Sequence, residues 1–126
     1  MRHSPPLTLL LADDNPTFLS TLRAYFETVD GVRVVAEARD GQQAVALADL
    51  YTPDLVVIDL AMPRMGGLEA TRILKARSPV PRVAVLTLND GEGYRRAAFE
   101  AGVDFFISKD RFHQEIRAVL DGMARP

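Results

Sequence analysis

Short apolar runs alternate along the chain with segments whose apolar residues recur every three or four positions. The short runs are rich in Val, Leu and Ile, as in buried strands, and lie at Leu7–Ala12, Val32–Ala38, Leu55–Asp59, Arg82–Thr87 and Asp104–Lys109. The longer segments have helical spacing. It predicts a first helix that buries Phe18, Leu22, Tyr25 or Phe26, and Val29, and a last helix that buries Phe112, Ile116, Val119 or Leu120, and Met123. Three further helices are expected at Gly41–Leu50, Gly67–Arg77 and Gly91–Ala101.

Strict alternation of five strands and five helices favours an α/β fold, with a doubly wound parallel sheet covered by helices on both faces. Leu7–Leu11 and Leu55–Ile58 are almost uniformly apolar, as central parallel strands are. Val32–Ala38 carries Arg33 and Glu37, which is typical of an edge strand. This pattern favours the strand order 2-1-3-4-5 over the other common order, 3-2-1-4-5-6.

Composition fits a single globular domain. The chain has 126 residues, 48% of them hydrophobic and 25% charged. It has no cysteine, which excludes disulfides, thiolate metal sites and cysteine nucleophiles. With a net charge of -2, it has no overall attraction for DNA, RNA or anionic lipid. We expect a soluble, cytoplasmic domain at residues 7–123 that does not enter a membrane, with a frayed lead at 1–6 and a tail at 124–126.

Polar side chains follow the predicted strands where their carboxyl ends meet at one edge of the sheet. These residues are Asp13 and Asp14 after the first strand, then Asp59, Thr87 and Lys109 at the ends of the third, fourth and fifth. Three carboxylates so close repel one another, and an oxygen-only set of ligands suits Mg²⁺ or Ca²⁺. A phosphate oxygen would give the lysine and the threonine a partner, and Asp59 would then be a candidate nucleophile.

Each of these residues also has an ordinary structural interpretation. Asp13-Asp14-Asn15 before Pro16 is a helix N-cap signal, with proline at the first helical position. A cap can still offer one carboxylate to a metal. Asp59 is harder to explain structurally, because a carboxylate that closes a buried apolar run costs desolvation energy without a partner. Gly66-Gly67 is expected to be a turn with positive φ, and His3 and His113 to be incidental.

Four stretches resemble response-regulator receiver domains of two-component signalling, and together the likeness extends from about Leu7 to Met123. The stretches are Leu11–Pro16, Pro53–Gly67, Val85–Thr87 and Ala101–Lys109. The resemblance implies a flavodoxin-like fold and a phosphorylation switch with no turnover activity beyond its own phosphorylation and dephosphorylation. Met62–Ala76 resembles receivers joined to helix-turn-helix domains, which implies transcription regulation. DNA would then be contacted only through an output domain that lies outside this chain.

The resemblance also implies roles for the strand-end residues. Asp59 would accept a phosphoryl group from a sensor histidine kinase. Asp14, Asp59 and the backbone carbonyl of Ala61 would hold Mg²⁺ directly, and Asp13 would act mainly through water. Lys109 would pair with the phosphoryl group.

Two further residues would transmit the signal. Thr87 would move toward the phosphoryl group, and Phe106 would turn inward into the space that it leaves. The change would reach the face made by the fourth helix, fifth strand and fifth helix, through which a homodimer is conceivable. The chain departs from the commonest family pattern at Leu88, Asn89 and Asp110, and Phe106 lacks the hydroxyl of a tyrosine.

Three alternative functions remain open at the level of sequence. A turnover phosphatase would commonly carry a second acid two positions after Asp59, where this chain has Ala61. A flavin mononucleotide carrier of the same fold would find its phosphate repelled by Asp13 and Asp14. A receiver that has lost phosphorylation would not need the full set of five polar residues, although Leu88 is a departure in its favour.

Overall fold

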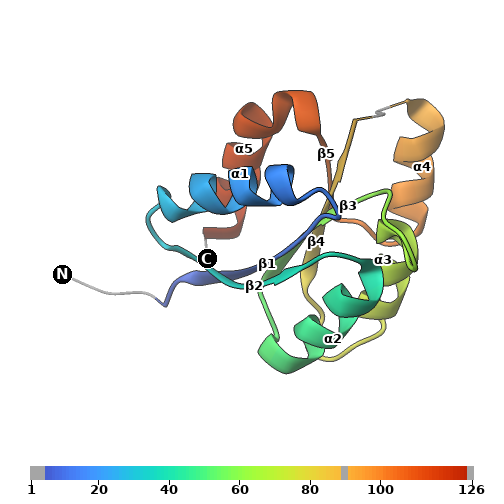
Figure 1. Ribbon diagram of the computed structural model, residues 1–126, viewed down its shortest axis with the longest axis horizontal. Coiled ribbons are helices and arrows are strands. Elements are labelled where there is room, and N and C mark those ends of the chain that lie inside the picture. The colour runs from blue at the N-terminus through green and yellow to red at the C-terminus, as the bar shows by residue number, and fades with distance from the viewer. Residues whose placement is uncertain (1–4, 89–90, 125–126) are drawn as a thin grey trace.

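The structure is a computed structural model that describes residues 5–88 and 91–124. Its strands are β1 (Leu7–Ala12), β2 (Val32–Ala38), β3 (Leu55–Asp59), β4 (Arg82–Thr87) and β5 (Phe105–Ser108). Its helices are α1 (Pro16–Glu27), α2 (Gly41–Tyr51), α3 (Gly67–Lys75), α4 (Glu92–Glu100) and α5 (Phe112–Ala124), with a 3₁₀ turn, η1, at Lys109–Arg111. All strand pairs are parallel and the order is β2-β1-β3-β4-β5, which confirms the predicted topology (Figure 1).

Helices cover both faces of the sheet (Figure 1). Successive side chains of a strand point to opposite faces, so Leu9 and Leu11 pack with α1 and α5, while Leu10 and Ala12 pack with α2, α3 and α4. All four side chains are fully buried. The central strands are therefore apolar on both sides, which leaves their carboxyl ends as the place where polar residues can reach solvent.

The fifth strand is shorter than the sequence pattern predicts. It lacks both Asp104 and Lys109, the two ends of the expected run. The Asp104 carboxylate accepts a hydrogen bond from Val83 N (2.8 Å) and pairs with Lys75, so it lies in the loop before the strand. Lys109 begins η1, where the Ser108 side chain accepts a hydrogen bond from Asp110 N at 3.2 Å.

The expectation of positive φ at Gly66-Gly67 is wrong. Neither residue has positive φ, and α3 begins at Gly67. Glycine is required at 67 for space, because a Cβ there would lie 2.3 Å from the backbone oxygen of Asp59. The left-handed residue in this loop is Arg64, with φ 64°. Its Nε donates to Asp40 Oδ2 at 2.8 Å, which ties the loop to the start of α2.

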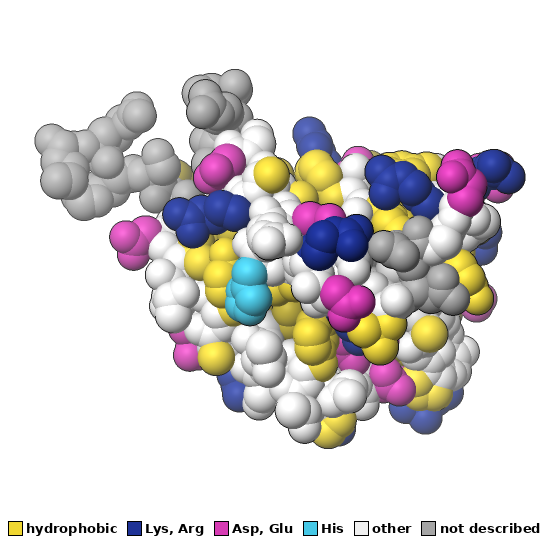
Figure 2. Space-filling view, turned by 90° about the horizontal axis from the view of Figure 1, so that it is seen from above, with side chains coloured by type: hydrophobic (Ala, Val, Ile, Leu, Met, Phe, Trp, Pro, Cys, Tyr) yellow, Lys and Arg dark blue, Asp and Glu magenta, His cyan; other side chains and the backbone are white. Residues whose placement is uncertain are grey.

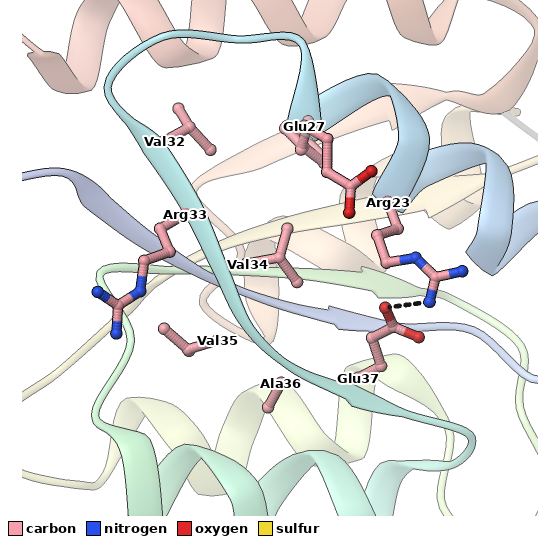
Figure 3. A pocket seen from close by; sticks show the side chains of 9 residues that line it. Arg23, Glu27, Val32, Arg33, Val34, Val35, Ala36 and Glu37 are labelled. Atoms are coloured by element: carbon pink, nitrogen blue, oxygen red, sulfur yellow. Dashed lines mark hydrogen bonds and ion pairs between the residues drawn. The ribbon is translucent and has the colours of Figure 1, made fainter.

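One of the two outer strands of the sheet is β2, whose side chains line the pocket drawn in Figure 3. Its pairing with β1 shifts register, since Leu9 lies opposite Val34 and Leu10 opposite Ala36. A cavity of about 460 Å³ lies between this strand and α1, where Arg23 pairs with Glu37 at 3.1 Å. The cavity shares no lining residue with the carboxyl ends of β3, β4 and β5.

Some sequence-based expectations fall outside the described residues. These are His3 with the rest of residues 1–4, Asn89, and residues 125–126. Helix α5 continues one residue past the predicted domain end, to Ala124. None of the helices in residues 5–88 and 91–124 has both the length and the apolar composition needed to cross a bilayer.

Candidate functional site

Neighbouring strands bring the predicted site residues to one edge of the sheet. Asp13 directly follows β1, and its backbone N–H extends the ladder by donating to Ala38 O at 3.1 Å. Asp59 is the last residue of β3, and Thr87 is the last of β4, where it lies opposite Ser108 of β5. Lys109 follows immediately. The parallel register therefore determines the convergence that the sequence predicted.

Three carboxylates meet at this edge. Asp13, Asp14 and Asp59 each have one carboxylate oxygen in a group whose members all lie within 4.8 Å of one another. Asp13 and Asp59 are buried, whereas Asp14 is exposed and gives the cluster an open side. Oxygen ligands with an open side are suited to a hard divalent cation that keeps some of its water, as Mg²⁺ does.

The Asp13 carboxylate supplies a direct test of fit for such an ion. Its Oδ1 accepts a hydrogen bond from Asn15 N at 2.8 Å. Its Oδ2 is buried, and its partner among the described residues is the Lys109 ammonium at 2.9 Å, an ion pair that Lys109 shares with Asp59. One ammonium cannot balance three clustered carboxylates, and a cation within the carboxylate group would neutralise the charge that remains.

Lys109 is the positive charge of the site. Its Nζ lies 2.9 Å from Asp13 Oδ2 and 3.5 Å from Asp59 Oδ2. Its side chain is only 11% exposed. The ammonium group therefore lies between two buried carboxylates, closer to Asp13 than to the residue predicted to be the nucleophile.

Asp59 is held in an unfavourable environment for a charge. Burial, together with the neighbouring Asp13 carboxylate, raises the pKa of Asp59 to about 6. Lys109 opposes both effects, as does a long hydrogen bond of 3.4 Å from Ala61 N to Asp59 Oδ1. A carboxyl group with a pKa raised in this way, at the centre of a charged cluster, is typical of a functional site.

A cavity of about 250 Å³ leads to Asp59. Its walls are formed by Asp59, Leu60, Ala61, Thr87, Leu88, Tyr94 and Lys109. Leu88 is 72% exposed and Tyr94 49% exposed, so two large apolar side chains stand at the entrance. Leu88 was singled out in the sequence, whereas Tyr94 was missed because nothing in helix spacing indicates that its side chain reaches a strand end.

Phe106 lies on β5 beside α4. Its half-buried ring faces Phe99 at a centroid distance of 6.5 Å, and the Arg95 guanidinium lies 5.4 Å from its centroid. The structure thus places the predicted switch residue next to α4, while its movement remains a prediction. His113 is exposed and has ring contacts only with Tyr25 and Phe112 within the described chain.

Charge is mixed on the surface around α1, α5 and the β4–α4 connection. Figure 2 looks down on this side and shows acidic and basic side chains interspersed among apolar ones. The described residues of this face form no large patch of one sign. This agrees with the small net charge of -2.

Comparison with known proteins gives consistent matches. Residues 9–121 match the family model of the response regulator receiver domain. The nitrate/nitrite response regulator protein NarL of Escherichia coli is 32% identical over 120 residues, which is 95% of this chain. A LuxR-family two-component response regulator from Aurantimonas is 36% identical over 93% of the chain and 86% of that structure, with a TM-score of 0.84.

A solved receiver domain is similar along its whole length. The signal receiver domain of the putative response regulator NarL from Mycobacterium tuberculosis has a TM-score of 0.90 and 28% identity, over 97% of this chain and all of that one. By contrast, this chain spans 56% of the length of the Escherichia coli NarL protein.

Proposed function

The chain belongs to the response regulator receiver domain family, and on that premise we propose that it is a phosphorylation-activated switch whose phosphoacceptor is Asp59. One observation supports this most strongly. Three carboxylates and the Lys109 ammonium come from three separate strand ends and meet at one edge of the sheet, where Asp59 and Lys109 line a cavity. Structural ion pairs do not need a third carboxylate, so the surplus negative charge favours a site for a cation and a phosphoryl group.

We assign the cation as Mg²⁺. Asp14, Asp59 and the backbone carbonyl of Ala61 would hold it, with Asp13 acting through water. The fit is supported by the surplus of negative charge, because three carboxylates in the cluster face the single ammonium of Lys109. When bound, Mg²⁺ supplies positive charge that neutralises the carboxylates and the incoming phosphoryl oxygens.

The proposed chemistry is transfer of a phosphoryl group to Asp59. A carboxylate oxygen of Asp59 forms a P–O bond while the P–N bond of a phosphohistidine donor breaks, and the histidine nitrogen leaves with the electron pair and is then protonated. Lys109 stabilises the negative charge on the phosphoryl oxygens as a point charge. The other residues of the site form no covalent bonds in this step, so positioning and electrostatic stabilisation account for the rate.

The proposed output is a shift between two arrangements of one face. Thr87 lies in the cavity with Asp59, and Phe106 lies on the adjacent strand beside α4. A hydrogen bond from Thr87 to the phosphoryl group would let Phe106 turn inward and change the face made by α4, β5 and α5. A 100-fold change in bias requires about 2.7 kcal/mol, which one or two charge-assisted hydrogen bonds can supply.

The proposed partners follow from the family. A sensor histidine kinase would be the phosphodonor, and a homodimer could form through the α4-β5-α5 face. Several relatives are named as transcriptional regulators, DegU of Brevibacillus brevis among them. We therefore propose a role in transcription regulation, with DNA bound by a separate output domain and with residues 7–123 as the receiver unit. The cytoplasm is the proposed location, which a chain without cysteine suits.

The test is phosphorylation with a small-molecule donor. The 126-residue chain is incubated with acetyl phosphate, with Mg²⁺ or with a chelator, and followed by intact-mass spectrometry. One phosphoryl group is expected per chain in Mg²⁺, and none in the chelator or in Asp59→Asn. Asp30→Asn, an exposed acid outside the site, is the matched control and is expected to label like the parent.

Two results would overturn the proposal. Stoichiometric labelling of Asp59→Asn would show that another residue accepts the group. Failure of the folded parent to label or to bind beryllofluoride with Mg²⁺ would remove the switch altogether and favour a receiver that acts only as an interaction module.

A further inference from the structure

The ammonium group of Lys109 has an aromatic neighbour in addition to its two carboxylates. Its Nζ lies 4.4 Å from the centroid of the Phe18 ring. This is well within the distance of about 6 Å at which a ring face attracts a cation. The same nitrogen lies 2.9 Å from Asp13 Oδ2 and 3.5 Å from Asp59 Oδ2. Little of its charge faces water, because the Lys109 side chain is only 11% exposed.

The Phe18 ring is held from two directions. Phe18 lies in the first turn of α1, where its backbone N–H donates to the capping Asn15 Oδ1 at 3.1 Å. Its ring meets Phe112 at the start of α5 edge to face, with centroids 6.5 Å apart and planes at 76°. Phe112 is 4% exposed and belongs to the core. The ring that faces the lysine is therefore braced by its own helix and by α5.

A lysine needs such a neighbour if its ammonium group is to stay in one place. The side chain has a flexible four-carbon stem, and the compact ammonium carries three rotatable donors. Asp13 is the nearer carboxylate and draws the nitrogen away from Asp59. A ring face on a further side excludes water there and adds an attraction that does not compete for the carboxylate oxygens.

We propose that Phe18 is a positioning residue, whose ring face holds the Lys109 ammonium beside Asp59 so that it can meet the phosphoryl group. This inference rests on the proposed function, because that function gives Lys109 a phosphoryl group to meet. Phe18 itself touches neither the acceptor nor the phosphoryl group, and it acts through the lysine.

Phe18 could instead be only an apolar filler between α1 and α5, and substitutions distinguish the two roles. Phe18→Leu keeps an apolar side chain but removes the ring face. Phe18→Tyr keeps the ring face. Tyr25→Leu is the matched control, since Tyr25 lies on the same helix and contacts Phe112 at 5.4 Å, while its ring makes no contact with Lys109 among the described residues.

The measurement is the affinity for beryllofluoride at saturating Mg²⁺, followed by ¹⁹F NMR or calorimetry. Phe18→Leu is expected to weaken binding about five- to tenfold, in the range of a desolvated cation–ring contact. Phe18→Tyr restores most of the affinity, and Tyr25→Leu binds like the parent. Melting temperatures identify any unfolded variant, and Phe18→Met replaces Phe18→Leu if the latter does not fold.

A second arm shows whether the effect passes through the lysine. In a Lys109→Gln background the ammonium is absent, so adding Phe18→Leu should weaken beryllofluoride binding no further. A purely structural role would keep its full cost in that background.

The outcomes separate this inference from the function on which it rests. Equal affinities for Phe18→Leu and Phe18→Tyr would overturn it, as would an undiminished Phe18→Leu effect with Lys109→Gln. In either case a parent that binds beryllofluoride leaves the proposed switch intact. A parent that does not bind it overturns the switch first and this inference with it.

Discussion

At the scale of single residues, the charged form of Asp59 is unfavourable in the folded chain. Its carboxyl group is buried beside Asp13, which raises its pKa to about 6 in the folded chain from 3.8. Below about pH 4, Asp59 is protonated in both the folded and the unfolded state, so its ionisation does not lower the free energy of unfolding. As the pH rises through 4 to 6, the unfolded chain ionises more readily, and folding stability falls.

Asp59→Asn is therefore expected to stabilise the metal-free protein. At pH 7 the free energy of unfolding should rise by about 1–3 kcal/mol, and the gain should vanish near pH 4. Urea unfolding in a chelator at several pH values measures this, with Asp30→Asn as the exposed control. A variant no more stable than the parent at pH 7 would show that the cluster relaxes its charges in another way.

The sequence identified the polar residues of the site but not their environment. Asp13, Asp59, Thr87 and Lys109 were predictable because each ends or follows an apolar run. The sequence could not predict that the Lys109 ammonium lies closer to Asp13 Oδ2, at 2.9 Å, than to Asp59 Oδ2, at 3.5 Å, because this difference depends on side-chain packing. For Phe18 the sequence predicted only a core position, because apolar residues at helical spacing do not show which of their side chains contacts a residue beyond the end of the helix.

At the scale of elements, α1 begins through a cap that also shapes the site. Asn15 Oδ1 accepts hydrogen bonds from Thr17 N at 2.9 Å and Phe18 N at 3.1 Å, and Pro16 occupies the first turn. The sequence predicted this cap from Asn-Pro. The adjacent residues Asp13 and Asp14 are thereby fixed at the helix start, so one segment provides both the cap and two carboxylates of the proposed cation site.

Asn15→Ala is expected to destabilise the fold by about 1 kcal/mol through loss of both hydrogen bonds. Asn15→Ser retains an acceptor and should recover most of that loss. Chemical denaturation of the parent and both variants gives the comparison. Equal stability of the alanine and serine variants would mean that the hydrogen bonds of the cap contribute nothing measurable.

The loop after β3 is tied to α2 by Arg64. Asp40 caps α2 by accepting from Gln43 N at 2.8 Å and pairs with Arg64 through its other oxygen. The hydrogen bond from Gln43 and the pair with Arg64 hold the pKa of Asp40 below its usual value. Since a lowered pKa favours the ionised folded state, this contribution is present at neutral pH and is lost as the pH falls below about 4.

Two substitutions at position 64 separate the ion pair from backbone strain. Arg64→Ala loses the pair and keeps an unfavourable φ, whereas Arg64→Gly loses the pair but adopts φ 64° without strain. The glycine variant is expected to be the more stable by about 1 kcal/mol, measured by thermal melting at pH 7. An alanine variant as stable as the parent would show that the ion pair contributes nothing, and a glycine variant no more stable than the alanine variant would show that the φ carries no strain.

Element boundaries were predictable where the apolar pattern was unbroken. They were less predictable where hydrogen bonds or ion pairs of side chains end a strand. Strands β1 to β4 have the predicted bounds. The fifth lost both ends because Asp104 is committed to Lys75 and Val83 N, and because Ser108 starts a 3₁₀ turn. Gly67 showed the same limit, since a pattern cannot distinguish a glycine needed for φ from one needed for space.

At the scale of the whole molecule, the proposed cation binding would stabilise the folded chain, because the carboxylate cluster exists only in that state. Mg²⁺ at about 100 times its dissociation constant should add about 2.7 kcal/mol to the free energy of unfolding and raise the melting temperature by several degrees. The gain should shrink as the pH falls through about 6, because protons then compete for Asp59. Thermal melts with and without Mg²⁺ at pH 5 and pH 7.5 measure both effects.

The test variant for that experiment is Asp14→Asn, which removes the exposed carboxylate of the cluster. It should lose most of the stabilisation by Mg²⁺, whereas Asp30→Asn should retain it. Equal stabilisation of Asp14→Asn and the parent would place the ion elsewhere on the molecule.

The register shift in β2 bears on how the molecule behaves when it is crowded. An open sheet edge can recruit strands from other copies and so begin fibril growth. Here the extra residue Val35 breaks the regular ladder, and Arg33 and Glu37 stand on either side of it. The backbone hydrogen-bonding groups of an added strand would not align with those of β2, and the strand would have to bury two charged side chains. The edge is therefore protected against strand addition, and we expect deletion of Val35 to lower the concentration at which the chain begins to precipitate, measured by light scattering.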